Sequence, residues 1–264
     1  MMLRLNGVRK YFGRGTINEV LALDGVTLDI EKGEFVCVIG SNGAGKSTLM
    51  NSIAGTFFPD EGSVVLQDNA ITNWPEHKRA KFIGRVFQDP LSGTSANMTI
   101  EENMAIAMLR GKRRGLSRGV KPAHRELFQN RLKKLELGLE NRLHDRVGLL
   151  SGGQRQALTM LMATLVRPDI LLLDEHTAAL DPKTAELILS LTRELVEELS
   201  LTTLMITHNM HHALAFGSRV IMMHRGRVIF DVRGEKVKSL TVDTLLESFH
   251  SVGIAEFSDR MLLV

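Results

Sequence analysis

Residues 40–47 read Gly-Ser-Asn-Gly-Ala-Gly-Lys-Ser, and the sequence on either side of them has a different character. Residues 35–39, just before, are continuously apolar, which is typical of a strand buried on both faces. Residues 46–54, just after, favour a helix. The segment is therefore predicted to be a glycine-rich turn that joins a buried strand to the N-terminus of a helix.

This turn fits the pattern G-x-x-x-x-G-K-[ST], which between a strand and a helix indicates a phosphate-binding loop. Glycines let the backbone curl until several N–H groups face one anion, and the helix N-terminus adds a favourable dipole. Lys46 can reach the β- and γ-phosphates of a nucleoside triphosphate, and the Ser47 hydroxyl can bind Mg²⁺. The alternative is a glycine-rich turn with an incidental lysine. The residues predicted to hold the nucleotide are Ser41, Asn42, Gly43, Ala44, Gly45, Lys46, Ser47 and Thr48.

The rest of the chain alternates between short apolar runs and amphipathic stretches. We expect strands at residues 3–11, 20–30, 34–39, 62–67, 170–173, 202–206, 219–223 and 228–231. We expect helices at residues 46–54, 153–166, 182–199, 210–216 and 242–249, with a further helical stretch at 99–137. Strands that alternate with amphipathic helices predict an α/β fold with a parallel sheet covered on both faces.

The composition of the 264-residue chain excludes several classes of protein. Hydrophobic residues make up 44% and charged residues 24%, which is the balance of a globular protein. The net charge of +3 is too small to indicate a nucleic-acid partner, and the single cysteine, Cys37, excludes an internal disulfide framework. We find no run of about 18 apolar residues and no signal-peptide pattern at the start, so we expect a soluble cytoplasmic protein.

Two acidic residues end the apolar run Ile-Leu-Leu-Leu-Asp-Glu at residues 170–175. Ligands of parallel α/β sheets lie at the carboxyl ends of the strands, so these acids can face the phosphate-binding loop. Asp174 is the candidate to hold Mg²⁺ through water, and Glu175 can polarise the attacking water as a general base. Alone, the same pattern also fits a helix cap.

Residues 150–156 read Leu-Ser-Gly-Gly-Gln-Arg-Gln. Together with the two motifs above, in this order, this segment resembles the signature of the ATP-binding-cassette ATPases, and the resemblance covers essentially the whole chain. Ser151 can cap the following helix, and two glycines let the helix N-terminus approach an anion closely. An ordinary capped helix is the alternative. The resemblance implies that Ser151, Gly152, Gly153 and Gln154 face the nucleotide held by a second copy.

The resemblance also implies roles for four single residues. Gln88 matches the glutamine that contacts Mg²⁺ and water and couples to a membrane partner, although it also fits a surface glutamine. Asp181 matches the acidic residue of the D-loop and also suits a helix N-cap. His208 matches the switch histidine near the γ-phosphate. Tyr11 lies where the family stacks an aromatic ring on adenine, with a core tyrosine as the alternative.

The family fold implied is a P-loop NTPase, RecA-like, whose parallel-sheet core carries an N-terminal antiparallel β subdomain and an inserted α-helical subdomain. The expected boundaries are residues 1–32 and 60–70 for the antiparallel part, 33–59, 71–88 and 167–235 for the core, 89–166 for the helical part, and 236–264 for a C-terminal helix and tail.

The function implied is that of an ATP-hydrolysing transporter subunit at the cytoplasmic face of the cell membrane. Two copies would enclose two ATP molecules with Mg²⁺ and drive separate permease subunits, together with an extracytoplasmic substrate-binding protein. Residues 93–103 and 174–177 are similar to importer ATPases that serve amino-acid uptake. The alternatives are a soluble member, such as an iron–sulfur assembly factor, and the ATPase of an exporter.

Three features remain open at this level. The family usually has proline after the catalytic glutamate, whereas this chain has His176. This histidine is either a neutral loop substitution or a group that makes hydrolysis depend on pH between about 6 and 8. The basic stretch 111–119 fits a solvated loop or a contact with acidic lipid or a partner, and residues 251–264 have no assigned role.

Overall fold

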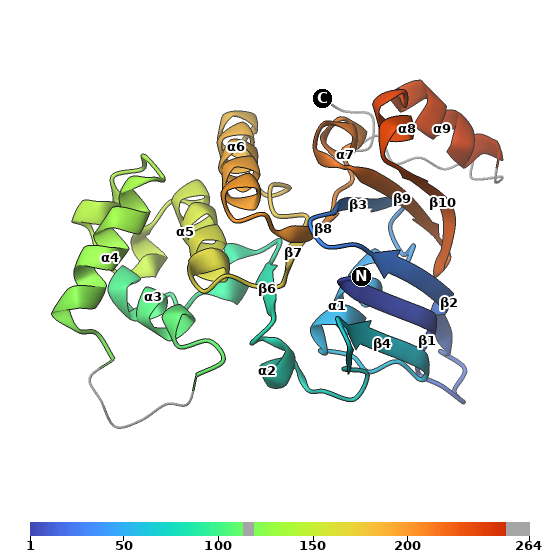
Figure 1. Ribbon diagram of the computed structural model, residues 1–264, viewed down its shortest axis with the longest axis horizontal. Coiled ribbons are helices and arrows are strands. Elements are labelled where there is room, and N and C mark those ends of the chain that lie inside the picture. The colour runs from blue at the N-terminus through green and yellow to red at the C-terminus, as the bar shows by residue number, and fades with distance from the viewer. Residues whose placement is uncertain (113–118, 252–264) are drawn as a thin grey trace. The chain divides into compact units, whose positions relative to one another are not determined.

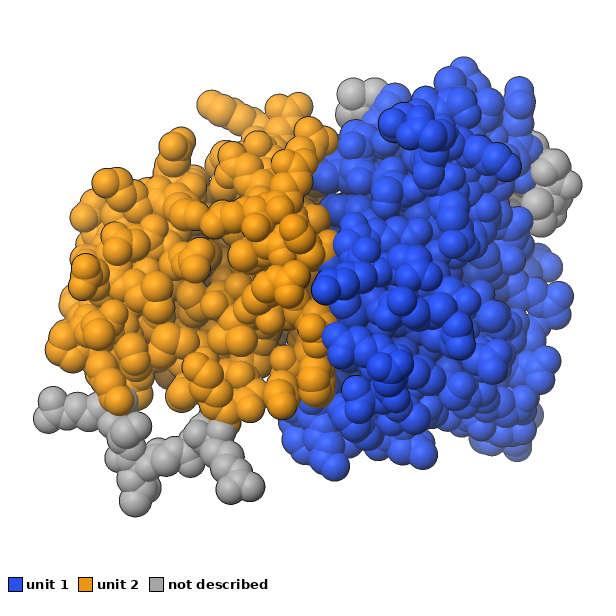
Figure 2. Space-filling model, in the orientation of Figure 1, with its two compact units in different colours: residues 1–79, 202–264 blue, residues 80–201 orange. Residues whose placement is uncertain are grey.

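The computed structural model describes residues 1–112 and 119–251 (Figure 1). The chain divides into two compact units, which Figure 2 colours separately. Unit 1 contains Met1–Arg79 and Thr202–Val264, and unit 2 contains Ala80–Leu201. The subdomain boundaries expected from the sequence stay a prediction. Most of the basic stretch 111–119 and all of the tail beyond residue 251 lie outside the described residues.

An antiparallel sheet forms one layer of unit 1, with its strands in the order β2-β1-β4-β5. Buried and exposed residues alternate at the start of β1, where Leu3 and Leu5 are fully buried and Arg4 and Asn6 are exposed, and the register shifts before the buried Val8. This alternation, with one face on the core, is what the sequence pattern predicts for such a sheet. Its strands are β1 (Leu3–Phe12), β2 (Val20–Ile30), β4 (Glu61–Leu66) and β5 (Asn69–Ala70).

The second sheet of unit 1 carries the phosphate-binding loop. Its strands in this unit are β3 (Phe35–Gly40), β8 (Thr202–Ile206), β9 (Arg219–His224) and β10 (Arg227–Arg233). They lie in the order β10-β9-β3-β8, where β3 pairs in parallel with β8 and β9, and β10 runs antiparallel to β9. Every residue of β3 and β8 is buried, which fits the continuous apolar run of β3. The helices of this unit are α1 (Lys46–Ala54), α2 (Glu76–Arg79), α7 (Met210–Phe216), α8 (Glu235–Lys238) and α9 (Val242–Ser251).

A fully buried arginine holds the C-terminal end of α1. The Arg79 guanidinium donates hydrogen bonds to the carbonyl oxygens of Ser52 and Ile53, at 2.7 and 2.8 Å, in the last turn of α1. It also donates to the carbonyl oxygens of Thr72 and Trp74. Burial lowers the pKa of Arg79 to about 10, so the side chain is charged at neutral pH. Four backbone acceptors therefore compensate one buried charge.

We predict that Arg79→Met lowers the free energy of unfolding by about 3–5 kcal/mol, because it leaves several buried carbonyl oxygens without a donor. Urea denaturation followed by circular dichroism measures this loss. Lys78→Met is the matched control, since Lys78 is an exposed neighbour on the same helix. Equal stability of the two variants would show that Arg79 does not anchor α1.

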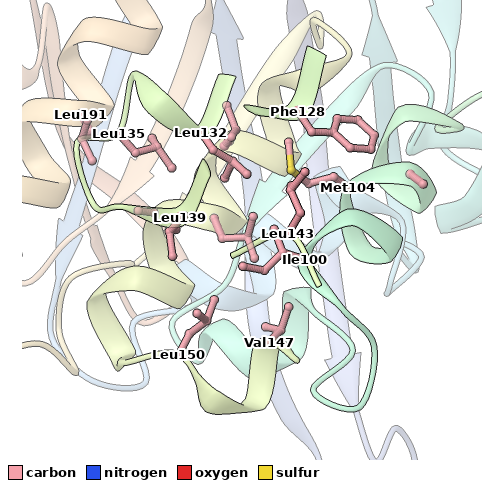
Figure 3. Close-up of a cluster of buried hydrophobic side chains, with 14 of the residues drawn as sticks. Ile100, Met104, Phe128, Leu132, Leu135, Leu139, Leu143, Val147, Leu150 and Leu191 are labelled. Atoms are coloured by element: carbon pink, nitrogen blue, oxygen red, sulfur yellow. The ribbon is translucent and has the colours of Figure 1, made fainter. Parts of the chain in front are cut away.

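In the described residues of unit 2, two parallel strands lie with four α-helices. Strands β6 (Ile83–Val86) and β7 (Ile170–Asp174) pair from Ile83 with Ile170 to Val86 with Leu173. The helices are α3 (Ile100–Met108), α4 (Pro122–Lys133), α5 (Gly152–Leu165) and α6 (Pro182–Glu198). Figure 3 shows the apolar cluster at their centre, to which α4 gives Phe128 and Leu132 and α6 gives Leu191. The sequence pattern did not predict β6, whose four residues include Gly84 and Arg85.

Candidate active site

The phosphate-binding loop joins β3 to α1 as predicted, and a side chain at Gly40 or Gly45 would clash with a backbone carbonyl oxygen. Gly45 has φ +98°, and a Cβ atom there would lie 2.5 Å from the Ala22 carbonyl oxygen. A Cβ at Gly40 would clash with the Met223 carbonyl oxygen. Backbone hydrogen bonds from Ala44 N–H to the Ser41 oxygen and from Gly226 N–H to the Ala44 oxygen hold the curl of the loop. The shape of the loop is therefore supported by one hydrogen bond of its own backbone and one from the backbone of Gly226.

Lys46 begins α1 and folds back over the loop. Its side chain is buried, and Nζ donates to the carbonyl oxygens of Gly40 at 2.7 Å and Ser41 at 3.0 Å. No side chain caps α1, because Gly45 stands at the N-cap position. The first-turn N–H groups of such a helix bind anions well. Ser47 is exposed and Thr48 is half-buried at the same end, as a site for phosphate requires.

His208 follows β8, which pairs directly with β3. Since Val38 pairs with Ile206 in parallel register, the phosphate-binding loop and His208 both follow the carboxyl ends of neighbouring strands. His208 is half-buried, and the next residue, Asn209, caps α7 through its side-chain oxygen. In unit 1, the predicted switch histidine and the phosphate-binding loop thus lie at the carboxyl ends of two neighbouring strands, β8 and β3.

Tyr11 lies near the end of β1 and is half-buried rather than a core residue. Its backbone N–H donates to Asp60 at 2.7 Å, which fixes the main chain at this position. The Arg14 guanidinium lies 4.6 Å from the centre of the ring. A cation over one face of the tyrosine leaves the opposite face as the one suited to stacking on a base.

In unit 2, the acidic residues and the glutamine follow neighbouring strands. Asp174 ends β7 and Gln88 comes two residues after β6, and the two strands are parallel and in register. Gln88 is exposed and Asp174 and Glu175 are half-buried. Glu175 has a left-handed backbone with φ +43°, which is uncommon for a residue with a side chain. The predicted magnesium ligands and general base of this unit therefore lie together at the carboxyl ends of β6 and β7.

Arg85 is a member of this cluster that our sequence reasoning missed. Its guanidinium lies 3.2 Å from the Asp174 carboxylate and 4.5 Å from the centre of the Phe87 ring. Both partners of the ion pair are largely buried. Arg85 thereby links the strand before Gln88 to the carboxylate that ends β7. The only signal in the sequence is a charged residue inside an otherwise apolar run, which by itself indicates nothing about its partner.

The signature segment forms the capped helix start that its sequence predicts. Ser151 Oγ accepts from the Gln154 backbone N–H, and Gln154 Oε1 accepts from the Ser151 N–H, both at 3.2 Å. This reciprocal capping box begins α5. The side chain of Gln154 also accepts from the Arg142 guanidinium at 3.4 Å and donates to the Leu137 carbonyl oxygen at 3.5 Å, while Ser151 and Gly152 are exposed. The exposed backbone of a helix N-terminus remains available to an anion.

Asp181, the predicted D-loop residue, starts a helix that lies beside the signature segment within unit 2. Asp181 caps α6 by accepting from the Thr184 backbone N–H at 3.1 Å, as expected of an N-cap. Hydrogen bonds from Thr184 lower the pKa of the Asp181 carboxyl. Gly153 packs so closely on Thr184 that a Cβ at Gly153 would clash with its methyl group. The starts of α5 and α6 are therefore held together.

The chemistry of these donors fits a nucleotide with a hard cation. The phosphate-binding loop supplies backbone N–H groups and a lysine, which match phosphate oxygens. In unit 1, Ser47 offers a hydroxyl oxygen, and in unit 2, Gln88 and Asp174 offer an amide and a carboxylate oxygen; each is a ligand type that Mg²⁺ accepts. The assignment of each residue to its role remains a prediction. Among the described residues, no helix is both long and apolar enough to cross a bilayer.

Comparison with known proteins identifies relatives over nearly the whole chain. Residues 23–178 match the family model described as ABC transporter. The chain is 44% identical to a tyrosine transport ATP-binding protein of Clostridioides difficile, covering 94% of this chain and 98% of the relative. It is 34% identical to a methionine import ATP-binding protein of Corynebacterium efficiens, covering 86% of this chain but only 61% of that longer protein.

Solved structures agree with this assignment. A dimeric ATP-binding cassette in a post-hydrolysis state with ADP and phosphate has a TM-score of 0.75 and 33% identity, covering 88% of this chain and 98% of that chain. A nucleotide-free cassette from an ABC transporter has a TM-score of 0.76 and 29% identity, covering 97% of this chain and 99% of that chain. The predicted P-loop NTPase fold is thereby confirmed.

A glycine-rich phosphate-binding loop in an α/β fold, with an acidic residue that ends a buried strand, defines a P-loop ATPase. The chain belongs to the ABC transporter family, in which it is the ATP-binding domain. It is an ATPase that uses ATP with Mg²⁺, as this family does. The sequence-based prediction of the family, the enzyme class and the cofactors is confirmed.

Proposed function

We propose that this chain is the energy-coupling ATPase subunit of an importer, in which two copies enclose two ATP molecules with Mg²⁺. The observation that carries the proposal is the 44% identity to the tyrosine transport ATP-binding protein, because the alignment spans 98% of that relative. A match of nearly full length supports a similar role for the whole polypeptide. The dimeric cassette with ADP and phosphate supports the proposed assembly.

Hydrolysis is assigned to residues of both units. Glu175 accepts a proton from a water molecule, whose oxygen attacks the γ-phosphorus. The bond between the γ-phosphorus and the oxygen bridging to the β-phosphorus breaks, and ADP and inorganic phosphate are released. Lys46 and the loop N–H groups bind the phosphate oxygens, and His208 contacts the γ-phosphate. Ser47, Asp174 and Gln88 would hold the Mg²⁺ ion, which would supply neutralisation of the negative charge on the phosphates.

The second copy completes each site in this proposal. Its signature segment, residues 151–154, faces the nucleotide bound by the phosphate-binding loop of the first copy, and Asp181 lies at the same interface. Tyr11 stacks on the adenine. The dimer is stabilised by a ligand that both copies share, so loss of the γ-phosphate opens it. Gln88 transmits this change to a separate permease, which places the chain peripherally at the cytoplasmic face of the membrane.

An amino acid is the proposed cargo. The tyrosine and methionine relatives carry the amino-acid assignment in their names, which supports uptake of this class of solute. An extracytoplasmic substrate-binding protein is the proposed carrier of the cargo to the permease. A soluble assembly ATPase and an exporter ATPase are the rival functions, because the same fold serves several roles.

Affinity purification of the full chain from detergent-solubilised native membranes, followed by mass spectrometry, tests whether the chain binds a permease. A second experiment measures uptake of labelled tyrosine and methionine in cells that lack the gene and carry either the wild type or Glu175→Gln. It tests whether these amino acids are the cargo. We expect a polytopic membrane protein in near-equal amount and uptake restored by the wild type alone. Recovery only with soluble assembly factors, and uptake of both amino acids unchanged by loss of the gene, would contradict the proposal.

A further inference from the structure

A buried histidine stands directly after Glu175. His176 is 2% exposed, although it follows the end of β7 where the polar cluster begins. Its imidazole Nε2 lies 3.1 Å from the hydroxyl oxygen of Thr192, in the middle of α6. The sequence left open whether this histidine is a neutral loop substitution or a group that makes hydrolysis depend on pH, and it did not indicate that the side chain is buried. A buried imidazole needs hydrogen-bond partners, and Thr192 is one of them.

The direction of this hydrogen bond follows from the second contact of Thr192. Its hydroxyl donates to the carbonyl oxygen of Ile188 at 2.7 Å, one turn earlier in α6. A hydroxyl has one proton, so the oxygen of Thr192 accepts from the imidazole. Nε2 of His176 therefore carries a proton, and the ring is fixed in position and orientation by a fully buried residue.

The helix that receives this hydrogen bond is itself rigidly packed. Ile188 and Leu191, which precede Thr192 by one helical turn and by one residue, belong to the apolar cluster of unit 2, and Figure 3 shows Leu191 within it. Thr192 is completely buried. A hydrogen-bond acceptor on such a packed helix has little freedom to move.

The backbone of Glu175 is held in an uncommon conformation between two anchors. On one side, β7 is in register with β6 up to the pair Val86–Leu173. On the other side, His176 is tied to α6 through Thr192. Between them, Glu175 has φ +43°, and its carbonyl oxygen accepts from the Ala178 N–H at 3.0 Å in a tight turn. Non-glycine residues keep a left-handed backbone only where their surroundings impose it.

We propose that His176 and Thr192 form a positioning pair. The pair fixes the backbone of Glu175 and thereby orients the Glu175 carboxylate toward the water molecule that attacks ATP. Neither residue of the pair contacts ATP in this proposal, so both act through Glu175. The inference rests on the proposed function of Glu175 as the general base. Small displacements of a catalytic group lower the rate strongly without weakening substrate binding.

The test compares two buried helical threonines in unit 2. Thr192→Val removes the acceptor for His176 and keeps the shape of the side chain. Thr164→Val is the matched control, because Thr164 in α5 is buried and donates to the Met160 carbonyl oxygen as Thr192 does to that of Ile188. Steady-state ATPase rates of the full chain are divided by the number of nucleotide-binding sites, titrated with a fluorescent ATP analogue. This division removes the effect of any misfolded fraction.

We expect Thr192→Val to lower kcat per site about tenfold and to leave KM and the affinity for the analogue within twofold. Thr164→Val is expected to change kcat less than twofold. Thr192→Ser restores the acceptor, so it is expected to restore kcat. His176→Leu should show the same loss, and the double variant His176→Leu/Thr192→Val should lose no more than either single variant, since the two residues act as one unit.

Two other outcomes would overturn the inference, and they can be told apart. If Glu175→Gln abolishes turnover while Thr192→Val and His176→Leu keep kcat per site, Glu175 is the base but the pair does not position it. If Glu175→Gln itself turns over at the wild-type rate, the proposed function of Glu175 is wrong and the pair has no base to position.

Discussion

Glu175→Gln is expected to lower the rate of ATP hydrolysis about a hundred- to a thousandfold while leaving ATP binding intact. The amide cannot accept the proton of the attacking water, and removal of a general base costs a factor of this order. Single-turnover measurements with radiolabelled ATP separate this loss from product release. Turnover at the wild-type rate would exclude Glu175 as the base.

The same variant is expected to form an ATP-bound dimer that survives gel filtration in the presence of Mg²⁺. Unhydrolysed ATP stays bound to both copies and stabilises the assembled state by mass action. Glu194→Gln is the control, because Glu194 is an exposed glutamate on α6 of the same unit. We expect the control to hydrolyse ATP normally and to elute as the wild type does.

Lys46→Ala is expected to weaken ATP binding by about a hundredfold or more, equivalent to about 2.7 kcal/mol. Lys46 is the buried ammonium of the phosphate-binding loop, and hydrogen bonds from a charged donor to phosphate are among the strong ones. Equilibrium titration with a fluorescent ATP analogue measures the change. This variant should therefore fail at binding, whereas Glu175→Gln should fail only at the chemical step.

Lys32→Ala is the matched control for charge, since Lys32 is an exposed lysine of the same unit that precedes β3. We expect it to bind the analogue with wild-type affinity. Lys46→Ala also removes a donor from the carbonyl oxygens of Gly40 and Ser41, so its melting temperature is measured alongside. An unchanged affinity in a folded Lys46→Ala variant would show that this loop does not bind the phosphates of ATP.

Elements with strong local patterns were predicted almost to the residue. The helix expected at 46–54 and the strand expected at 202–206 are α1 and β8 with these same bounds. The capping residues Ser151 and Asp181 make the backbone hydrogen bonds that their positions predict. These features depend on residues a few positions apart, so the sequence pattern contains most of the information.

Strand β6 was missed because its four residues lack such a pattern. Gly84 weakens any strand signal, yet a Cβ at this position would lie 2.8 Å from the Ala163 carbonyl oxygen, so close packing in unit 2 requires glycine there. Arg85 reads as a break in an apolar run, although its side chain lies against Phe87 and Asp174. Tertiary contacts thus make a strand from a segment with weak intrinsic preference.

The motifs of this chain determined its family and cofactors, because a phosphate-binding loop, a strand that ends in acids and a capped signature helix are all local arrangements. The distant partners of two largely buried polar side chains, His176 and Arg85, were decided by the tertiary structure. His176 meets Thr192 across 16 residues, and Arg85 meets Asp174 across 89. Such pairs form only when packing brings distant segments together, and the resulting burial then makes each hydrogen bond costly to lose.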